Sequence, residues 1–275
     1  MALINGTSAN DALNGTGSAD TIYGFDGHDA LYGNDGDDSL YGGLGHDTLV
    51  GGLGADYMEG NDGDDAYIVD DIGDVVVELS GEGSLDIVYS SLATYTLPDE
   101  VEILQWNGSG SFTATGNVLD NIIRSGGGAD ILSGGDGDDE LQAGGGNDAL
   151  NGGDGNDYLD GSSGADIYTG GAGSDFIRIG FFESGTGAAA DRITDFATGA
   201  DIVDVSAWDA NRNVAGNQAF TFIGGAAFSG TAGELRTYFD GVDTWAQADR
   251  NGDSVADFEI RFDGSVSLAA SDFIL

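Results

Sequence analysis

The sequence repeats itself every nine residues over two long stretches. In Gly24 to Leu49, which reads GFDGHDALYGNDGDDSLYGGLGHDTL, each unit opens on a glycine and carries an aspartate at its sixth position and an aliphatic residue at its eighth. The first array runs without a gap from Gly6 to Ile68, and a second array in the same phase runs from Gly116 to Arg178. A fixed period held over this length predicts a repeat architecture.

Both marked positions keep their chemistry through the two arrays. The eighth positions are apolar throughout, and the sixth hold an acid in every unit except the one with Asn121. A flexible linker rich in glycine and aspartate would not keep two positions in phase. The acids are Asp11, Asp20, Asp29, Asp38, Asp47, Asp56, Asp65, Asp130, Asp139, Asp148, Asp157, Asp166 and Asp175.

A unit with one apolar position predicts a short strand followed by a tight glycine turn. Neighbouring side chains in a strand point to opposite faces, so we expect only the eighth position to face inward. Two units make one coil, and stacked coils lie about 4.8 Å apart. Stacking places Asp29 above Asp11, and two carboxylates at that spacing repel by roughly 3 kcal/mol at an effective dielectric constant of about 20. Cations between them would relieve this repulsion, and calcium takes carboxylate and carbonyl oxygens in flexible geometry.

The units GGLGHDTLV and GGDGDDELQ resemble the repeat of the RTX family, the hemolysin-type calcium-binding repeat proteins. The resemblance implies a parallel β-roll with Ca2+ ions, up to about ten, between the loops of units i and i+2. It also implies that the thirteen aspartates above bind metal together with loop glycines. These glycines are Gly24, Gly27, Gly33, Gly36, Gly42, Gly43, Gly45, Gly51, Gly52, Gly54, Gly134, Gly135, Gly137, Gly152, Gly153, Gly155, Gly170, Gly171 and Gly173.

The segment between the arrays, residues 69–115, drops the nonapeptide but keeps strand-like runs such as DVVVELS and VEILQW. We interpret it as a calcium-free continuation of the solenoid. Glu78, Glu82 and Asp86 are candidates for a separate ion site, although solvated loop acids are the favoured interpretation.

Beyond the second array, DRITDFATGADIVDVS and DRNGDSVADFEI resemble parts of the C-terminal domain of serralysin-type secreted metalloproteases. Asp249, Asn251, Asp253 and Asp257 form either a hairpin turn around Asn251-Gly252 or a calcium loop, but the glycine is misplaced for an EF-hand. In these families an ending such as Asp272-Phe-Ile-Leu275 is read by the type I secretion apparatus.

Composition excludes several classes of partner. The 49 acidic residues outnumber 7 basic ones, for a formal charge of -42, so we expect no nucleic-acid binding and no affinity for anionic membranes. The absence of cysteine removes disulfides and thiolate metal sites. No apolar run is long enough for a transmembrane segment, and the start lacks the features of a cleaved signal peptide.

The sequence shows no familiar catalytic motif. It lacks the H-E-x-x-H zinc helix, the G-x-S-x-G elbow and the P-loop. His28 and His46 both occupy fifth positions and should stack, either as a two-histidine metal site or, as we favour, as exposed loop residues. Carboxylate pairs alone do not distinguish a glycosidase. We therefore expect no enzyme.

These observations predict an all-β fold, a parallel β-roll (β-solenoid) of calcium-binding nonapeptide repeats with a C-terminal β-rich capping domain. The expected parts are a first roll (1–68), a connecting segment (69–115), a second roll (116–178) and a serralysin-like C-terminal domain (179–275). The predicted function is that of a secreted, extracellular calcium-binding protein, exported by type I secretion, that folds on Ca2+ and acts at a surface, in a biofilm or on a host. The alternatives are a carbohydrate-binding module of the alginate-epimerase repeat type, with an extracellular polysaccharide as partner, and a secreted hydrolase.

Overall fold

The computed structural model describes residues 1–180 and 185–275, and it divides into two compact units, Met1–Ser125 and Gly126–Leu275. Within the described ranges every regular element is a β-strand except two single-turn 3₁₀ helices, η1 (Gly187–Ala189) and η2 (Ala270–Asp272). The predicted all-β solenoid is therefore confirmed. In the part of the chain that is described, no helix is long and apolar enough to cross a membrane.

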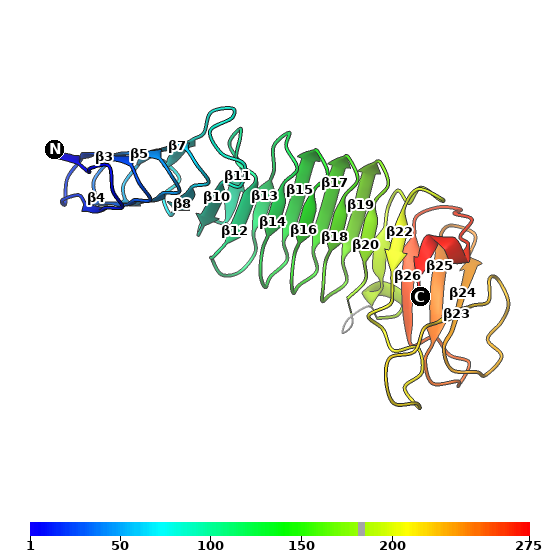
Figure 1. The fold of residues 1–275 in the computed structure, drawn as a ribbon. Coiled ribbons are helices and arrows are strands. Elements are labelled where there is room, and N and C mark those ends of the chain that lie inside the picture. The colour runs from blue at the N-terminus through cyan, green and yellow to red at the C-terminus, as the bar shows by residue number, and fades with distance from the viewer. Residues whose placement is uncertain (181–184) are drawn as a thin grey trace. The chain divides into compact units, whose positions relative to one another are not determined.

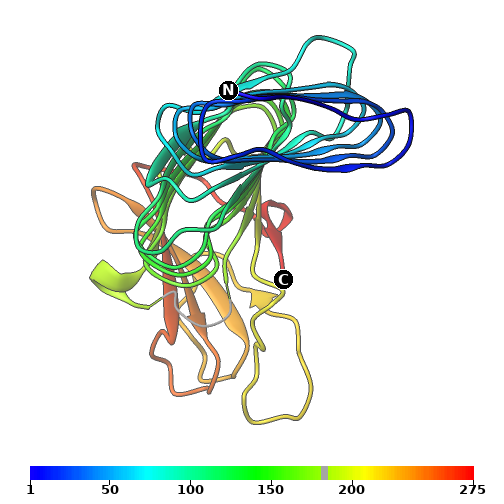
Figure 2. The ribbon, with the colours of Figure 1, turned by 90° about the vertical axis from the view of Figure 1, so that its left-hand side faces the viewer.

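The first unit is a flattened coil whose strands pair in parallel with the strands one coil away (Figures 1 and 2). Leu31 lies opposite Leu49, and Leu40 lies opposite Met58, so one coil takes 18 residues, as the period predicts. The eighth-position side chains from Ile22 to Tyr67 are fully buried between the two sheets. Their burial of apolar surface supplies the main driving force for stacking the coils.

Within the first unit, the strands form two sheets and one further parallel pair. One sheet contains β1 (Leu3–Asn5), β3 (Thr21–Asp26), β5 (Ser39–Leu44), β7 (Tyr57–Asp62) and β9 (Val75–Val77). The other contains β2 (Ala12–Asn14), β4 (Ala30–Asp35), β6 (Thr48–Leu53), β8 (Ala66–Val69), β10 (Ile87–Ser90), β12 (Ile103–Trp106) and β14 (Ile122–Arg124). The pair is β11 (Thr94–Thr96) with β13 (Thr113–Thr115).

These strands run further than a single inward position allows. In β3 both Ile22 and Gly24 are buried, and the same alternation recurs in β5 and β7. The prediction that only the eighth position faces inward is therefore wrong, because the first-position glycine also faces the interior. It does so because Gly24 comes two residues after Ile22 in the same strand, and alternate residues of a strand lie on the same face.

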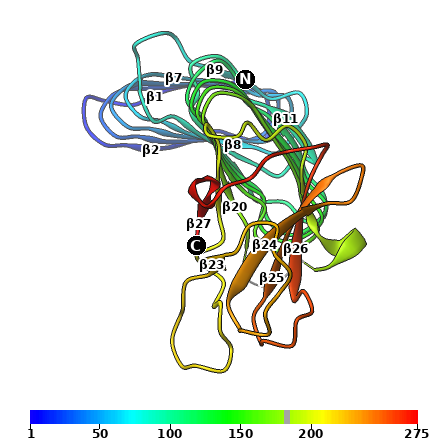
Figure 3. The ribbon, with the colours of Figure 1, turned by 90° about the vertical axis from the view of Figure 1, so that its right-hand side faces the viewer.

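The second unit starts as a roll of the same kind and extends both of its sheets into the C-terminal region (Figure 3). One sheet contains β16 (Glu140–Gln142), β18 (Tyr158–Asp160), β20 (Phe176–Arg178), β22 (Ile202–Asp204) and β27 (Phe273–Ile274). The other contains β15 (Ile131–Asp136), β17 (Ala149–Asp154), β19 (Ile167–Ala172), β21 (Asp191–Ile193), β26 (Phe258–Phe262), β25 (Thr244–Asp249), β24 (Glu234–Phe239) and β23 (Thr221–Phe222).

The change from roll to C-terminal region is a change of strand direction. β21 still pairs in parallel with β26, but β25 is antiparallel to both β26 and β24. An aromatic cluster replaces the aliphatic column of the roll: the rings of Trp208 and Phe258 lie 4.3 Å apart, and Phe220 packs edge-on against Phe258. The last strand of the roll is thereby covered by a β-rich region, as solenoid ends require.

Candidate metal centres

The repeated aspartates lie at the turn that precedes a strand, where all except the half-buried Asp11 are buried, and hydrogen bonds from one coil to the next hold them. The backbone N–H of Asp29 donates to Oδ1 of Asp47 at 2.7 Å, and the backbone N–H of Asp47 donates to Oδ1 of Asp65 at 2.6 Å. The same bond, from one aspartate to the next 18 residues on, joins Asp11 to Asp29, Asp20 to Asp38, Asp38 to Asp56, Asp130 to Asp148, Asp139 to Asp157, Asp148 to Asp166 and Asp157 to Asp175. A charge-assisted bond of this kind fixes one carboxylate oxygen and offsets part of the expected repulsion.

The second carboxylate oxygen is buried and accepts no hydrogen bond. This holds for Oδ2 of Asp29, Asp38, Asp47, Asp56, Asp65, Asp148, Asp157, Asp166 and Asp175. Burying a carboxylate oxygen without a partner costs free energy, so a column of such oxygens indicates that a ligand binds there.

The first-position glycine forms one wall of the space that this oxygen faces. A Cβ added at Gly42 would overlap Oδ2 of Asp47 and would lie 2.7 Å from the carbonyl oxygen of Gly60. Gly152 stands in the same relation to Asp157 and to the carbonyl oxygen of Gly170, at 2.6 Å. In these two units the carboxylate and carbonyl oxygens therefore converge on a small space that a Cβ at the first position would fill.

The other predicted glycines have a different role. Gly45 and Gly52, at the fourth and second positions, have φ values of 127° and 96°, a region that favours glycine. The same positive φ occurs at Gly27, Gly36, Gly43, Gly54, Gly135, Gly137, Gly153, Gly155, Gly171 and Gly173. The first-position glycines Gly24, Gly33, Gly51, Gly134 and Gly170 instead sit against an aspartate Oδ2, as Gly42 and Gly152 do.

The first two units differ from the rest. Thr7 donates to Oδ2 of Asp11 through its backbone N–H at 2.6 Å and its hydroxyl at 2.8 Å, and Thr16 does the same to Asp20 at 2.6 and 2.7 Å. The Thr16 hydroxyl foremost, and then the backbone N–H groups of Ala2 and Thr16, lower the pKa of Asp20 to about 2. Threonine thus supplies the partner that Oδ2 lacks in later units such as those of Asp29 and Asp47.

Burial dominates the electrostatics of the later sites. It raises the pKa of Asp56, Asp148 and Asp157 to about 6, and that of Asp65 and Asp166 to about 8. Desolvation disfavours the charged form, and the neighbouring aspartates add to the shift. A bound cation would favour the charged form and reverse it.

The column of aspartates continues past each array, which sequence reasoning missed. The backbone N–H of Asp56 donates to Asp74 at 3.1 Å, that of Asp65 donates to Asp86 at 2.7 Å, and that of Asp86 donates to Glu102 at 2.8 Å. In the second unit Asp166 is bonded to Asp191 and Asp175 to Asp201 in the same way, at 2.9 and 3.1 Å. Asp74 keeps the nine-residue phase, so the period could have predicted its place in the column. Insertions move the other acids out of phase.

Two of the acids assigned to the solvated loop are buried. Glu78 is 6% exposed and Asp86 is 1% exposed, so the favoured interpretation of them as solvated acids is wrong. Both lie with Asp65 in one cluster, whereas Glu82 is only half-buried. The strand β9 and the insertion after it bring them inside, which local composition does not reveal.

The histidines stack as the period predicts, with ring centroids 5.0 Å apart and nearly parallel. The backbone N–H of His46 donates to Nδ1 of His28 at 2.7 Å, and that of Asp64 donates to Nδ1 of His46 at 2.7 Å. Both rings are exposed, and backbone amides already occupy both Nδ1 atoms. The arrangement favours exposed loop residues over a two-histidine metal site.

The loop between β25 and β26 uses its acids as turn caps. Asp249 accepts bonds from the backbone N–H groups of Gly252 and Ser254 at 2.7 and 2.8 Å, and Asp253 accepts one from Val255 at 2.9 Å. Asp257 accepts one from Arg250 at 2.6 Å. These contacts favour the turn over a calcium loop.

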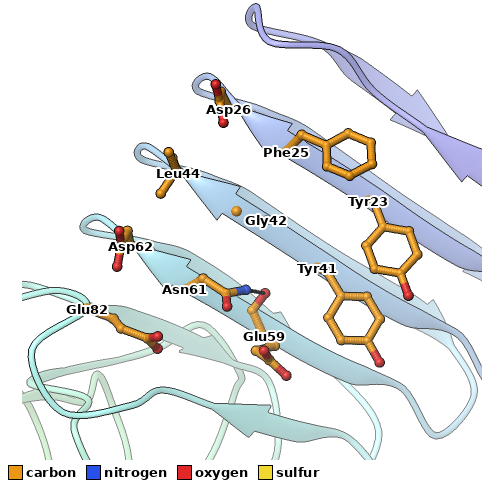
Figure 4. A pocket seen from close by; sticks show the side chains of 11 residues that line it. Tyr23, Phe25, Asp26, Tyr41, Gly42, Leu44, Glu59, Asn61, Asp62 and Glu82 are labelled. Carbon is orange, nitrogen blue, oxygen red and sulfur yellow. Dashed lines mark hydrogen bonds between the residues drawn. The ribbon is translucent and has the colours of Figure 1, made fainter.

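A hollow of about 500 Å³ lies on the outer face of β3, β5 and β7 (Figure 4). Tyr23 stacks on Tyr41 with ring centroids 4.8 Å apart, and Phe25 lies beside Tyr23. The polar part of its lining includes the acids Asp26, Asp62, Glu59 and Glu82 and contains no basic residue.

The donor set of the repeated sites fits calcium. A buried carboxylate oxygen lies near a glycine carbonyl oxygen at Asp29, Asp38, Asp47 and Asp157, and hard oxygen ligands of this kind are those that calcium prefers. Neither nitrogen nor sulfur faces these spaces in the contacts described above. The sites therefore belong to a class of calcium-type repeat centres in a parallel β-roll.

Comparison with known families agrees. Residues 5–40 match the RTX calcium-binding nonapeptide repeat (4 copies), and residues 37–275 match the peptidase M10 serralysin C terminal family. Because the second match spans most of the chain, the chain belongs to the serralysin C-terminal family, and it carries RTX calcium-binding repeats. No curated protein sequence matches it significantly.

Solved structures resemble it only in part. The AlgE6R2 and AlgE6R3 subunits of the Azotobacter vinelandii mannuronan C5-epimerase share 26% and 25% identity, with TM-scores of 0.34 and 0.28. The matches cover 60% and 57% of this chain, and 90% and 78% of those chains. Extracellular lipase LipA from Serratia marcescens is 14% identical with a TM-score of 0.24, and the match covers 98% of this chain and 39% of the lipase. Superpositions this loose carry no functional assignment.

Proposed function

We propose that this chain is a secreted, non-catalytic calcium-binding protein whose coils fold when calcium enters the aspartate column. The observation that carries the proposal is the series of buried Oδ2 atoms without partners, of which those of Asp29, Asp38, Asp47 and Asp157 lie beside a glycine carbonyl oxygen. Metal binding and folding are then one event, because the unfolded chain has no such site. The thirteen repeated aspartates and the glycines predicted with them are the proposed ligands and site walls, with Asp11 and Asp20 the weakest because threonine already satisfies them.

The fold also supports export before folding. Phe273 is buried and pairs with Val203 in the sheet, and Asp272 is 1% exposed. A secretion apparatus that reads the C-terminal residues therefore has to read them in the unfolded chain. In a calcium-poor cytosol the repulsion within a chain of charge -42 keeps it extended, and external calcium then closes the coil.

The test is a calcium titration followed by far-ultraviolet circular dichroism. We expect a cooperative transition from coil to β-sheet, with a higher midpoint in Asp38→Ala and Asp139→Ala. The control is Asp37→Asn, which removes the charge of the exposed neighbour of Asp38 but keeps the Oδ1 atom that accepts the backbone N–H of Ala55, and it should leave the midpoint unchanged. Full β-sheet content of the wild type in chelator at about pH 8 would overturn the proposal.

A second candidate function is binding of a neutral oligosaccharide on the Tyr23–Tyr41 surface. The backbone of Phe25 favours it: this residue has φ 77° at the position where Gly43 and Gly52 stand in other units, and it is 48% exposed. A left-handed conformation costs an aromatic residue roughly 1–2 kcal/mol, and strain kept at an exposed ring points to function. The acidic rim disfavours uronate polymers by like-charge repulsion.

Phe25→Gly separates stability from binding. We expect it to relieve the strain and lower the calcium midpoint, but to abolish chemical shift changes caused by cellohexaose, because the ring is lost. Asn34→Gly relieves the same backbone conformation on β4, outside the hollow, and should leave binding intact. Oligoguluronate binding in place of cellohexaose, or turnover of either polymer, would contradict this assignment.

A further inference from the structure

Three acids meet where the first array ends. Asp65, Glu78 and Asp86 are 1%, 6% and 1% exposed, and one oxygen atom from each lies within 4.8 Å of the other two. Only Asp65 belongs to the nonapeptide pattern. Glu78 follows β9, and Asp86 precedes β10 after an irregular insertion.

One oxygen of each carboxylate has a defined partner. Oδ1 of Asp65 accepts the backbone N–H of Asp47 at 2.6 Å, and Oδ1 of Asp86 accepts that of Asp65 at 2.7 Å. The buried hydroxyl of Tyr67 donates to Oε1 of Glu78. These bonds leave Oδ2 of Asp65, Oε2 of Glu78 and Oδ2 of Asp86, all buried and all without a hydrogen-bond partner.

The surroundings compensate none of this charge. No Lys, Arg or His side chain in the described residues forms an ion pair with the three acids. At Gly60 an added Cβ would overlap both Oδ2 of Asp65 and the Tyr67 hydroxyl and would lie 2.6 Å from Oε1 of Glu78, so these groups surround one small space. Three carboxylates are buried together only when they are protonated or when they bind a cation.

We propose that Asp65, Glu78 and Asp86 bind one divalent cation of the calcium type, at a site distinct from those of the repeats. The repeated sites combine ligands from equivalent aspartates on stacked coils, whereas this one adds a third carboxylate from a segment outside the repeat. Tyr67 acts as a positioning residue, because its hydroxyl orients Glu78. The ion would fasten the insertion of residues 70–86 to the last coil of the array. Only the identity of the ion rests on the proposed function.

The test counts calcium ions bound per folded chain by native mass spectrometry in Glu78→Gln and in the matched control Glu82→Gln. Both changes remove one charge from the same segment, but Glu82 is half-buried and bonds only the backbone N–H of Leu79 in the contacts described. We expect Glu82→Gln to bind as many ions as the wild type and Glu78→Gln to bind one fewer. Equal ion counts in the two variants would overturn the site.

A second variant guards against misfolding of Glu78→Gln. Tyr67→Phe keeps all three carboxylates and the buried ring. With terbium as the probe, we expect an unchanged number of bound ions but weaker emission on excitation of tyrosine, because Tyr67 contacts a ligand of the ion. Unchanged emission would contradict the proposal.

These experiments distinguish failure of this site from failure of the proposed function. A wild type that is fully folded in chelator, with one ion fewer in Glu78→Gln, would leave the site standing and remove calcium-driven folding. A cooperative calcium transition with equal ion counts in the two variants would support calcium-driven folding and overturn the site.

Discussion

At the scale of the residue, glycine has two separate physical roles in the repeat. Gly45 and its equivalents adopt a positive φ in the turn, whereas Gly42 and its equivalents sit in ordinary strand conformation with no room for a Cβ. The sequence shows only that both positions favour glycine. The distinction matters because the second role, unlike the first, is tied to the space in front of the carboxylate.

Gly42→Ala tests that role. The added methyl group would overlap Oδ2 of Asp47, and overpacking of this kind costs about 1–3 kcal/mol. We expect a higher calcium midpoint and a lower urea midpoint in saturating calcium.

Gly17→Ala is the control for this change. Gly17 is exposed, and the nearest heavy atom to an added Cβ is 4.0 Å away. Its effect should stay within about 0.5 kcal/mol. Equal effects of the two substitutions would show that the space in front of Asp47 has no special importance.

At the scale of the element, β21 joins the parallel roll to the antiparallel C-terminal sheet. Arg192 in β21 donates through Nε to Oδ1 of Asp263 at 2.8 Å and through Nη2 to Oδ2, next to the end of β26. A planar guanidinium bonds both oxygens of one carboxylate at once, which an ammonium group does not reproduce. This pair therefore fixes the register of two strands whose residues are far apart in the sequence.

Arg192→Lys should keep the charge and lose this geometry. We expect a loss of about 1 kcal/mol in the free energy of unfolding with calcium present, measured by urea unfolding with tryptophan fluorescence. The control Arg212→Lys alters a single, longer ion pair to Asp257 at 3.8 Å on an exposed side chain and should change little. A larger effect at Arg212 would contradict the argument.

At the scale of the whole molecule, the buried carboxylates couple folding to pH and to calcium. Burial raises the pKa of Asp65 and Asp166 to about 8 and that of Asp56, Asp148 and Asp157 to about 6, from an ordinary value of 3.8. Without metal, the folded chain then binds more protons than the unfolded chain between these values. Stability is therefore fully present below about pH 4 and is lost as the pH rises through 6 to 8.

In chelator, we expect β-sheet content, followed by circular dichroism, to fall as the pH is raised from 4 to 8. In saturating calcium it should persist over this range, and the calcium midpoint should fall with rising pH because binding releases protons. A metal-free fold that gains stability with pH would show that these carboxylates are compensated within the protein.

The sequence by itself determined the coil. Its period fixes 18 residues per turn, the stacking of Leu31 on Leu49 and of Leu40 on Met58, and an acid at each turn, because stacking identical units in register requires only local repetition. The sequence did not predict that the first-position glycine faces inward, because the length of a strand depends on the strand with which it pairs. Only the tertiary structure decided that, in aspartates such as Asp47, one carboxylate oxygen accepts a hydrogen bond from the preceding coil and the other is buried without one. It alone brought Glu78 and Asp86 to Asp65, because insertions break the period and contacts between coils then set the register.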